Sequence, residues 1–157
     1  MKLIFLDFDA VLNSYQYDKQ RGCNDGNIDE TRMPILFRIV AQTGAEIVLS
    51  TSWRKHWSPN PDENDPVGRE IDALFQKYGM KIFDKTPVSE NNDRAEEIRA
   101  YLAKCPYVQN FVILDDIRFG WGDLQSHVIN TSYRIGRGLE EGHSEAAIEL
   151  LNGSDLA

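Results

Sequence analysis

Short runs of apolar residues recur along the chain, and each is bounded by polar or glycine-containing segments. The runs cover residues 3–6, 47–49, 80–83, 111–114 and 128–129. They are continuous and do not alternate with polar residues, which is typical of strands buried on both faces of a parallel sheet. The pattern therefore predicts a mainly parallel sheet of five strands.

Between these runs, apolar residues recur at the spacing of an α-helix. We expect four helices: one from residue 29 or 31 to 44, one from 65 to 79, one from 92 or 93 to before 106, and one after 144. The second is the clearest, because Asp65 suits an N-cap, Pro66 suits the first turn and Gly79 suits the end. Strands that alternate with helices predict an α/β fold.

The chain has 157 residues, 41% of them hydrophobic, which is enough for one core and too little for two. We therefore expect a single domain over residues 1–157. Within it, residues 14–27 and 56–64 fit neither a helix nor a strand. Both follow predicted strands, so we interpret the regions of about 14–30 and 55–65 as loops on the substrate side of the sheet. Solvated surface connections are the alternative.

A formal net charge of −8 and a pI near 4.8 disfavour binding to duplex nucleic acid, whose affinity comes from Lys and Arg. Cys23 and Cys105 have neither disulfide-framework nor zinc-site spacing, so a reduced, cytoplasmic setting is expected. The apolar run at the N-terminus is too short for a signal peptide or a membrane span. We therefore expect no membrane association.

The first predicted strand leads directly into two carboxylates one residue apart, Asp7 and Asp9. Two like charges so close to a buried strand are costly unless a cation neutralises them. The pair therefore indicates a divalent metal with oxygen ligands, while two solvated residues that cap a turn are the alternative.

The strand predicted over residues 111–114 ends in the same way, at Asp115 and Asp116. Parallel strands bring their carboxyl ends to one edge of the sheet. We therefore expect the four carboxylates to converge on one Mg²⁺, which prefers hard oxygen ligands: Asp7, Asp9, Asp115 and Asp116.

Hydroxyl groups follow the strand predicted over residues 47–49, at Ser50, Thr51 and Ser52. Hydroxyl and backbone N–H donors can hold phosphate oxygens, so this segment is a candidate phosphate subsite. Thr51 is the preferred phosphate-binding hydroxyl, and a shift of one residue would give that role to Ser50 or Ser52.

An anionic substrate that faces four carboxylates needs positive charge besides the metal, and the candidates are Arg54, Lys85 and Arg94. Arg94 is favoured because it lies in the first turn of a predicted helix, whose positive end would face the phosphate. Lys85 is the substitute. The alternative for Arg94 is a solvated side chain near Glu96 and Glu97.

In this order, these segments resemble the motifs of the haloacid dehalogenase (HAD) superfamily of phosphohydrolases. The first motif, D-x-D-G-[TV], corresponds to residues 7–11, the second to residues 50–52 and the fourth to residues 115–116. The resemblance implies a Rossmann-like three-layer sandwich in which the first strand is central. The chain lacks an insertion long enough for a large cap domain, and it is similar to the phosphatase domains of RNA-repair and polynucleotide kinase enzymes.

The chain departs from the first motif at Ala10, where the superfamily generally has Gly. If the backbone at this position needs a positive φ, the alanine is strained, because its Cβ disfavours the left-handed region.

The implied activity is that of a Mg²⁺-dependent phosphatase acting on a phosphate monoester. Asp7 would attack phosphorus and form an aspartyl-phosphate, while Asp9 would act as general acid and base. Asp115 would bind the metal directly, and Asp116 would bind it through water or orient the cationic side chain. The expected substrate is a phosphorylated small molecule or the end of a nucleotide or oligonucleotide. The alternatives are a phosphotransferase on the same scaffold and a non-catalytic module that binds phosphate or nucleic-acid ends.

Overall fold

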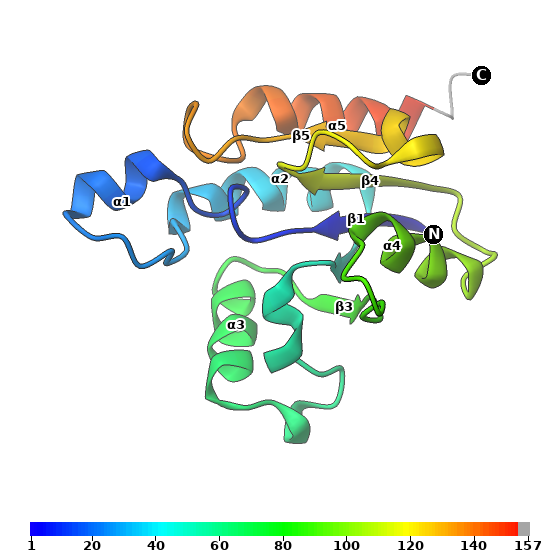
Figure 1. Ribbon diagram of the computed structural model, residues 1–157, viewed down its shortest axis with the longest axis horizontal. Coiled ribbons are helices and arrows are strands. Elements are labelled where there is room, and N and C mark those ends of the chain that lie inside the picture. Colours follow the sequence, from blue (N-terminus) through cyan, green and yellow to red (C-terminus); the bar gives the residue numbers. More distant parts are fainter. Residues whose placement is uncertain (154–157) are drawn as a thin grey trace.

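A computed structural model of the chain describes residues 1–153, and its centre is a five-stranded parallel sheet (Figure 1). The strands are β1 (Lys2–Leu6), β2 (Glu46–Leu49), β3 (Ile82–Lys85), β4 (Asn110–Asp115) and β5 (Val128–Asn130). Their order is β3-β2-β1-β4-β5, so β1 is central and lies between β2 and β4. The expectation of a parallel sheet with the first strand at its centre is confirmed.

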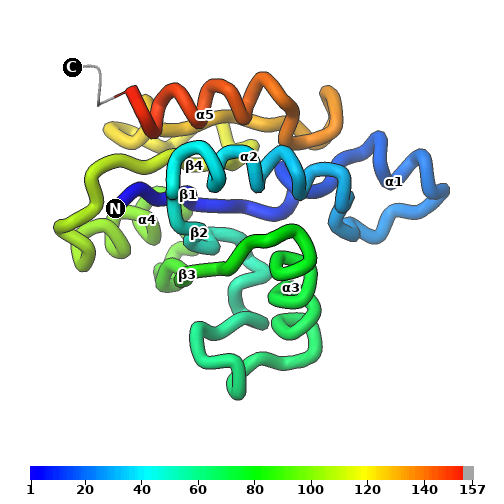
Figure 2. Tube along the Cα trace, turned by 180° about the vertical axis from the view of Figure 1, so that it is seen from behind, coloured from blue at the N-terminus to red at the C-terminus, as the bar shows by residue number. Residues whose placement is uncertain are grey.

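Helices cover both faces of this sheet. α2 (Met33–Thr43), α3 (Pro66–Lys77) and α5 (Glu141–Gly153) contribute to the core on one face, and α4 (Arg94–Ala103) contributes to the core on the other. The short helix α1 (Tyr15–Arg21) lies beyond the carboxyl ends of the strands (Figure 1). The 3₁₀ turns are η1 (Glu30–Arg32), η2 (Ser52–His56), η3 (Pro61–Glu63) and η4 (Gly122–His127). Seen from behind, α2 and α5 run side by side along one face of the sheet (Figure 2).

Two hydrophobic cores hold these layers together, one on each side of β1. Ile4 and Leu6 belong to the larger core, which also contains side chains of α2, α3 and α5. Leu3 and Phe5 point the other way, into a second core with α4 and η4. Alternate residues of one strand thus enter opposite cores, because successive side chains of a strand point to opposite faces. The three-layer α/β sandwich is confirmed, and the described residues contain no large cap domain.

The strand register decides which side chains meet at the edge of the sheet. Leu6 of β1 pairs with Leu49 of β2 and with Leu114 of β4. The next residue along each strand is therefore level with the other two, at the carboxyl ends of three neighbouring strands. The strand register thus places Asp7, Ser50 and Asp115 together, although they are far apart in the chain.

Several element boundaries differ from those expected. The third strand covers Ile82–Lys85 instead of residues 80–83, because the N–H of Met80 donates to the Phe75 carbonyl at the end of α3. The last helix begins at Glu141, and Ser144 is buried inside it.

Residues 14–27, which show no clear pattern in sequence, contain the short helix α1. Ser14 caps its start, and Gly22 ends it in the left-handed conformation (φ 67°). Inside it, the buried Asp18 carboxylate accepts hydrogen bonds from Arg21 and from the Tyr133 hydroxyl. Because the helix depends on caps and on one buried polar residue, an apolar stripe does not reveal it.

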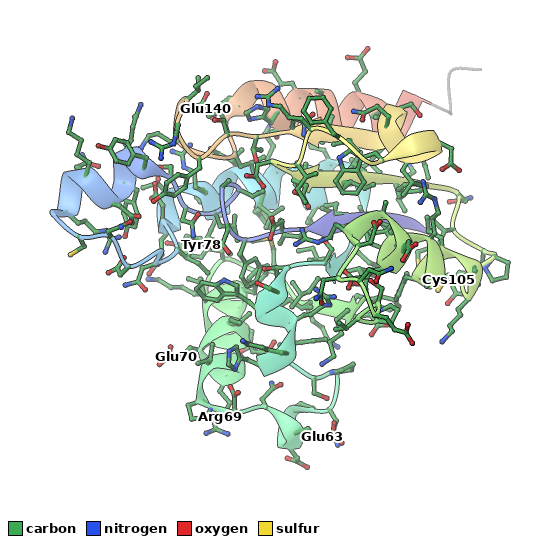
Figure 3. The ribbon with its side chains drawn as sticks, viewed as in Figure 1. Glu63, Arg69, Glu70, Tyr78, Cys105 and Glu140 are labelled. Atoms are coloured by element: carbon green, nitrogen blue, oxygen red, sulfur yellow. The ribbon has the colours of Figure 1, made fainter. Side chains whose placement is uncertain are left out.

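The segment with η2, η3 and α3 projects from the β3 side of the sheet, where Glu63, Arg69 and Glu70 are labelled in Figure 3. The backbones of α3 and η2 meet at Gly68, where a Cβ atom would lie 2.0 Å from the carbonyl oxygen of His56. Only glycine permits this approach. None of the helices in residues 1–153 is both long enough and apolar enough to cross a membrane.

Candidate active site

Three carboxylates meet where β1 and β4 end. One oxygen each from Asp7, Asp115 and Asp116 lies within 4.8 Å of the other two. The Asp7 and Asp115 side chains are buried, whereas Asp116 is exposed. The structure thus brings together three of the four predicted metal ligands.

Arg94, the first residue of α4, reaches into this group. Its Nη1 lies 2.5 Å from Oδ2 of Asp115 and 3.3 Å from Oδ2 of Asp7. Asp93 caps the helix by accepting from the N–H groups of Ala95 and Glu96, which fixes the helix start and the origin of the Arg94 side chain. Burial alone would lower the pKa of Arg94, but Asp7 and Asp115 outweigh it and raise the pKa. The guanidinium therefore remains charged beside the carboxylates.

The buried carboxylates themselves are costly to ionise without a further cation. Burial is the main cause that raises the pKa of Asp7, from 3.8 to about 7, and Asp115 and Asp9 raise it further against the effect of Arg94. Burial also raises the pKa of Asp115. One arginine therefore does not balance the carboxylates, and the site is suited to additional positive charge.

Asp9 takes a different position from Asp7. Its side chain is exposed and is not a member of the three-carboxylate group. One Asp9 oxygen accepts a hydrogen bond from Asn13 Nδ2 at 3.0 Å, and the same amide group donates to the carbonyl of Gly26. The Asp9 carboxylate is therefore held at the mouth of the site.

The turn between Asp7 and Asn13 has the strained backbone considered above. Ala10 has a φ of 66°, in the left-handed region, and is almost fully buried. Its N–H donates to Asn13 Oδ1 at 2.7 Å. The Asn13 side chain thus closes the turn and helps to hold Ala10 in a conformation that an alanine disfavours.

The three hydroxyl residues after β2 differ in their surroundings. Ser50 is fully buried, and its hydroxyl has no hydrogen-bond partner among the described residues. The Thr51 hydroxyl is also buried and accepts from the N–H of Trp53 at 3.3 Å, as the cap of η2. Ser52 is exposed.

The guanidinium donors of Arg54 are used by protein groups, so they are not free to bind a ligand. Its guanidinium pairs with Glu97 at 2.9 Å, and both side chains are buried. Its remaining donors reach backbone carbonyls at the ends of β2 and β3: those of Ser50, Thr51, Thr86 and Pro87. Arg54 therefore braces the hydroxyl segment from behind, in contrast to the phosphate contact expected from sequence.

Lys85 is similarly engaged away from the carboxylates. Its ammonium group donates to the carbonyl of Arg54 at 3.1 Å and to that of Trp57 at 2.5 Å. Of the three candidate cations, Arg94 is thus the one that contacts Asp7 and Asp115.

A family model described as the HAD domain in Swiss Army Knife RNA repair proteins matches residues 3–143. The chain belongs to this HAD family. Searches of curated proteins and of solved structures gave no match. Membership confirms the resemblance noted in the sequence, including the relation to RNA-repair enzymes, and supports a phosphohydrolase-type activity.

Two residues that shape this HAD domain site were not singled out from the sequence. Asn13 ties Asp9 to the turn, and Glu97 pairs with Arg54 and also accepts from the N–H of Ser89. Asn13 lies only four residues after Asp9, so its short spacing was a usable signal. For Glu97 the sequence suggests Arg94 as the partner, because the two share one helix.

Proposed function

We propose that this HAD domain is a Mg²⁺-dependent phosphatase that hydrolyses a phosphate monoester through an aspartyl-phosphate on Asp7. The observation that carries the proposal is the group formed by Asp7, Asp115, Asp116 and Arg94 at the carboxyl ends of β1 and β4. A buried carboxylate can act as the nucleophile on phosphorus, and neighbouring metal-binding carboxylates and an arginine can supply the positive charge that in-line attack needs.

The donor set fits Mg²⁺. Asp7, Asp115 and Asp116 offer hard carboxylate oxygens close enough together to share one ion, and a bound cation would offset the charge of the buried carboxylates Asp7 and Asp115. When bound, the ion would neutralise charge on the phosphoryl oxygens.

The chain's own groups supply the remaining steps. Asp7 Oδ1 accepts from the N–H of Phe8 at 2.8 Å, which orients the carboxylate and leaves Oδ2 on the side of Arg94. Arg94 would hold the equatorial phosphoryl oxygens. Asp9, exposed at the mouth of the site, would protonate the leaving oxygen and then take a proton from the attacking water.

The hydroxyl segment completes the phosphate subsite in this proposal. Thr51 remains the preferred phosphate donor, because its hydroxyl hydrogen is not used by the cap that its oxygen makes with Trp53. The unpartnered hydroxyl of Ser50 is the neighbouring candidate.

We infer that the substrate is a phosphorylated nucleic-acid end, since the matching family is described by RNA repair proteins. Access from solvent supports this inference, because Asp9 and Asp116 are exposed and no large cap lies among residues 1–153. Residues 14–30 and 55–65 would contact such a substrate. A phosphorylated small molecule remains the alternative substrate class.

Hydrolysis of an aryl phosphate tests the activity. We expect phosphate release with millimolar Mg²⁺ and a loss of about 100-fold or more in EDTA, because the metal contributes several kcal/mol of charge stabilisation. Release that is insensitive to EDTA would contradict the metal requirement. Binding of phosphate without any turnover would instead identify a non-catalytic binding module.

Mg²⁺ binding should also be linked to pH through Asp7. The pKa of Asp7 in the folded protein, about 7, exceeds 3.8, so the metal-free fold loses stability from this group as pH rises from about 4 through 7. Mg²⁺ binds the ionised form, and at pH 5 proton competition should weaken its apparent affinity by about 100-fold relative to high pH.

Thermal unfolding measures this linkage. At pH 8, Mg²⁺ at about 100 times its Kd should raise the Tm by about 5–10 °C, and the same concentration should have a much smaller effect at pH 5. Asp62→Asn, a change of an exposed carboxylate on η3, is the control and should leave the pH dependence unaltered. An equal Tm increase at both pH values would show that Asp7 does not compete with the ion for a proton.

A further inference from the structure

A cavity of about 390 Å³ adjoins the carboxylate group on the side of β5. Its walls come from the loops that follow β4 and β5, and they include Asp116, Arg118, Thr131, Ser132 and Arg134. Asp116 belongs both to this cavity and to the carboxylate group. A ligand in the cavity would therefore lie next to a phosphoryl group held at Asp7.

Two exposed arginines of this cavity have no acceptor among the residues that the structure describes. Within residues 1–153, Arg118 and Arg134 take part in no hydrogen bond or ion pair, although the chain carries a net charge of −8. All the other arginines are bound to carboxylates or carbonyls: Arg21, Arg32, Arg38, Arg54, Arg69, Arg94, Arg99 and Arg137. Two unpaired guanidinium groups in one cavity thus stand out in an acidic protein and suit an anionic ligand.

The cavity also contains an unsatisfied hydroxyl. Thr131 is 1% exposed, and its Oγ1 has no hydrogen-bond partner among the described residues. Buried hydroxyls are normally hydrogen-bonded, so this one has an unused donor and acceptor. It lies immediately after β5, and its N–H donates to the carbonyl of Asp115.

Arg134 is exposed, and its guanidinium lies near an aromatic residue. Its guanidinium lies 5.9 Å from the ring centre of Tyr15, which in turn meets Tyr133 edge-on. Tyr133 is anchored through its hydroxyl to the buried carboxylate of Asp18 in α1. The arginine therefore lies against the aromatic wall of the cavity, and no carboxylate of residues 1–153 forms an ion pair with it. Asp116 is the acidic residue that lines the cavity, and it is also one of the three carboxylates that would bind the cation.

We propose that this cavity is a subsite for a second phosphate of the substrate, recognised by Arg118 and Arg134. The proposal deepens the proposed function and rests on it, because the subsite matters for catalysis only if the first phosphate is hydrolysed at Asp7. The ligand class is a phosphate ester with another phosphate close to the scissile one. Either a nucleoside bisphosphate or the next phosphodiester of an oligonucleotide supplies this chemistry.

Steady-state kinetics on matched substrates test the subsite. The substrates are an aryl phosphate, a nucleoside 3′-monophosphate, a nucleoside 3′,5′-bisphosphate and a trinucleotide with a 3′-terminal phosphate. The unaltered protein should prefer at least one two-phosphate substrate over the monophosphate. Arg118→Gln and Arg134→Gln should each reduce that preference about tenfold, mainly through KM, because each removes a charge-assisted hydrogen bond. Arg38→Gln, an exposed arginine on α2, is the matched control and should leave the preference unchanged.

The two sources of the second phosphate give different patterns. A preference confined to the trinucleotide and lost in the variants assigns the subsite to an oligonucleotide backbone, whereas a preference shared by the bisphosphate assigns it to any second phosphate. No preference in the unaltered protein, or an equal loss on the aryl phosphate, would overturn the proposal.

Direct binding separates failure of the subsite from failure of the proposed function. If no substrate is turned over, the phosphatase proposal fails, and calorimetric titration of the bisphosphate and the monophosphate with Mg²⁺ present then tests the cavity alone. The bisphosphate should bind about tenfold more tightly than the monophosphate, and Arg118→Gln should remove the difference. Equal affinities would overturn the subsite independently of catalysis.

Discussion

Replacement of Asp7 by asparagine is expected to abolish phosphate release, with a loss in kcat of about 10⁴-fold or more, while the fold is kept. Asparagine is close in shape to aspartate but cannot act as the attacking carboxylate. Its side-chain oxygen can still accept the hydrogen bond from the N–H of Phe8 that orients Asp7. The variant therefore removes the nucleophile without removing the contact that positions it.

The same change should not destabilise the metal-free protein. Burial raises the pKa of Asp7 to about 7, so the fold already favours a neutral side chain at this position. The Tm of Asp7→Asn without Mg²⁺ should equal or exceed that of the unaltered protein at pH 8, and Asp62→Asn should retain full activity. Phosphate release by Asp7→Asn at more than a few per cent of the normal rate would exclude the covalent mechanism.

The sequence predicts the sheet well because its signals are local. Each strand buried on both faces appears as a continuous apolar run, and a parallel arrangement brings the ends of β1 and β4 to one edge. The proximity of Asp7 and Asp115 follows from these two facts together. The secondary structure expected from the sequence is wrong at α1, because this helix is stabilised by its caps and by a single buried polar contact and has no apolar stripe.

The site was harder to predict, because a side chain's type does not determine which way it points. Asp9 and Asp7 are two residues apart on one turn, yet Asp7 is buried beside Arg94, and Asp9 is exposed and bound to Asn13. The chain turns directly after Asp9, where Ala10 has a positive φ and both residues are hydrogen-bonded to the Asn13 side chain. The burial of Asp7 beside Arg94, in contrast, depends on a tertiary contact with α4 that the spacing of residues 7–13 does not contain.

For Arg54, too, the residue type did not reveal which groups the side chain contacts. From the sequence, an arginine after three hydroxyl residues suggests a phosphate contact, but its partner Glu97 is more than forty residues away. Carbonyls at the ends of β2 and β3 take its other donors. The structure therefore assigns Arg54 a positioning role for the segment that carries Thr51.

Replacement of Arg54 by methionine is expected to lower the free energy of unfolding by about 3–5 kcal/mol, the usual cost of removing one partner of a buried ion pair. The change leaves the Glu97 carboxylate buried without its charge partner, and it removes the guanidinium donors from the carbonyls of Ser50 and Thr86. The Thr51 carbonyl loses its guanidinium donor but keeps the backbone N–H of residue 54. Urea unfolding measures the loss. Arg38→Met, which removes an exposed ion pair on α2, is the control and should cost less than about 1 kcal/mol.

A double variant, Arg54→Met with Glu97→Gln, separates the two contributions. If charge pairing alone mattered, removal of both charges would restore most of the stability, as replacement of buried ion pairs often does. We expect at least about 2 kcal/mol of the loss to remain, because buried carbonyls that lose their donors each cost about 1–3 kcal/mol. The double variant should also bind phosphate more weakly, since the backbone of Ser50 and Thr51 is no longer held by the guanidinium. Full recovery of stability together with unchanged phosphate binding would mean that Arg54 serves only to neutralise Glu97.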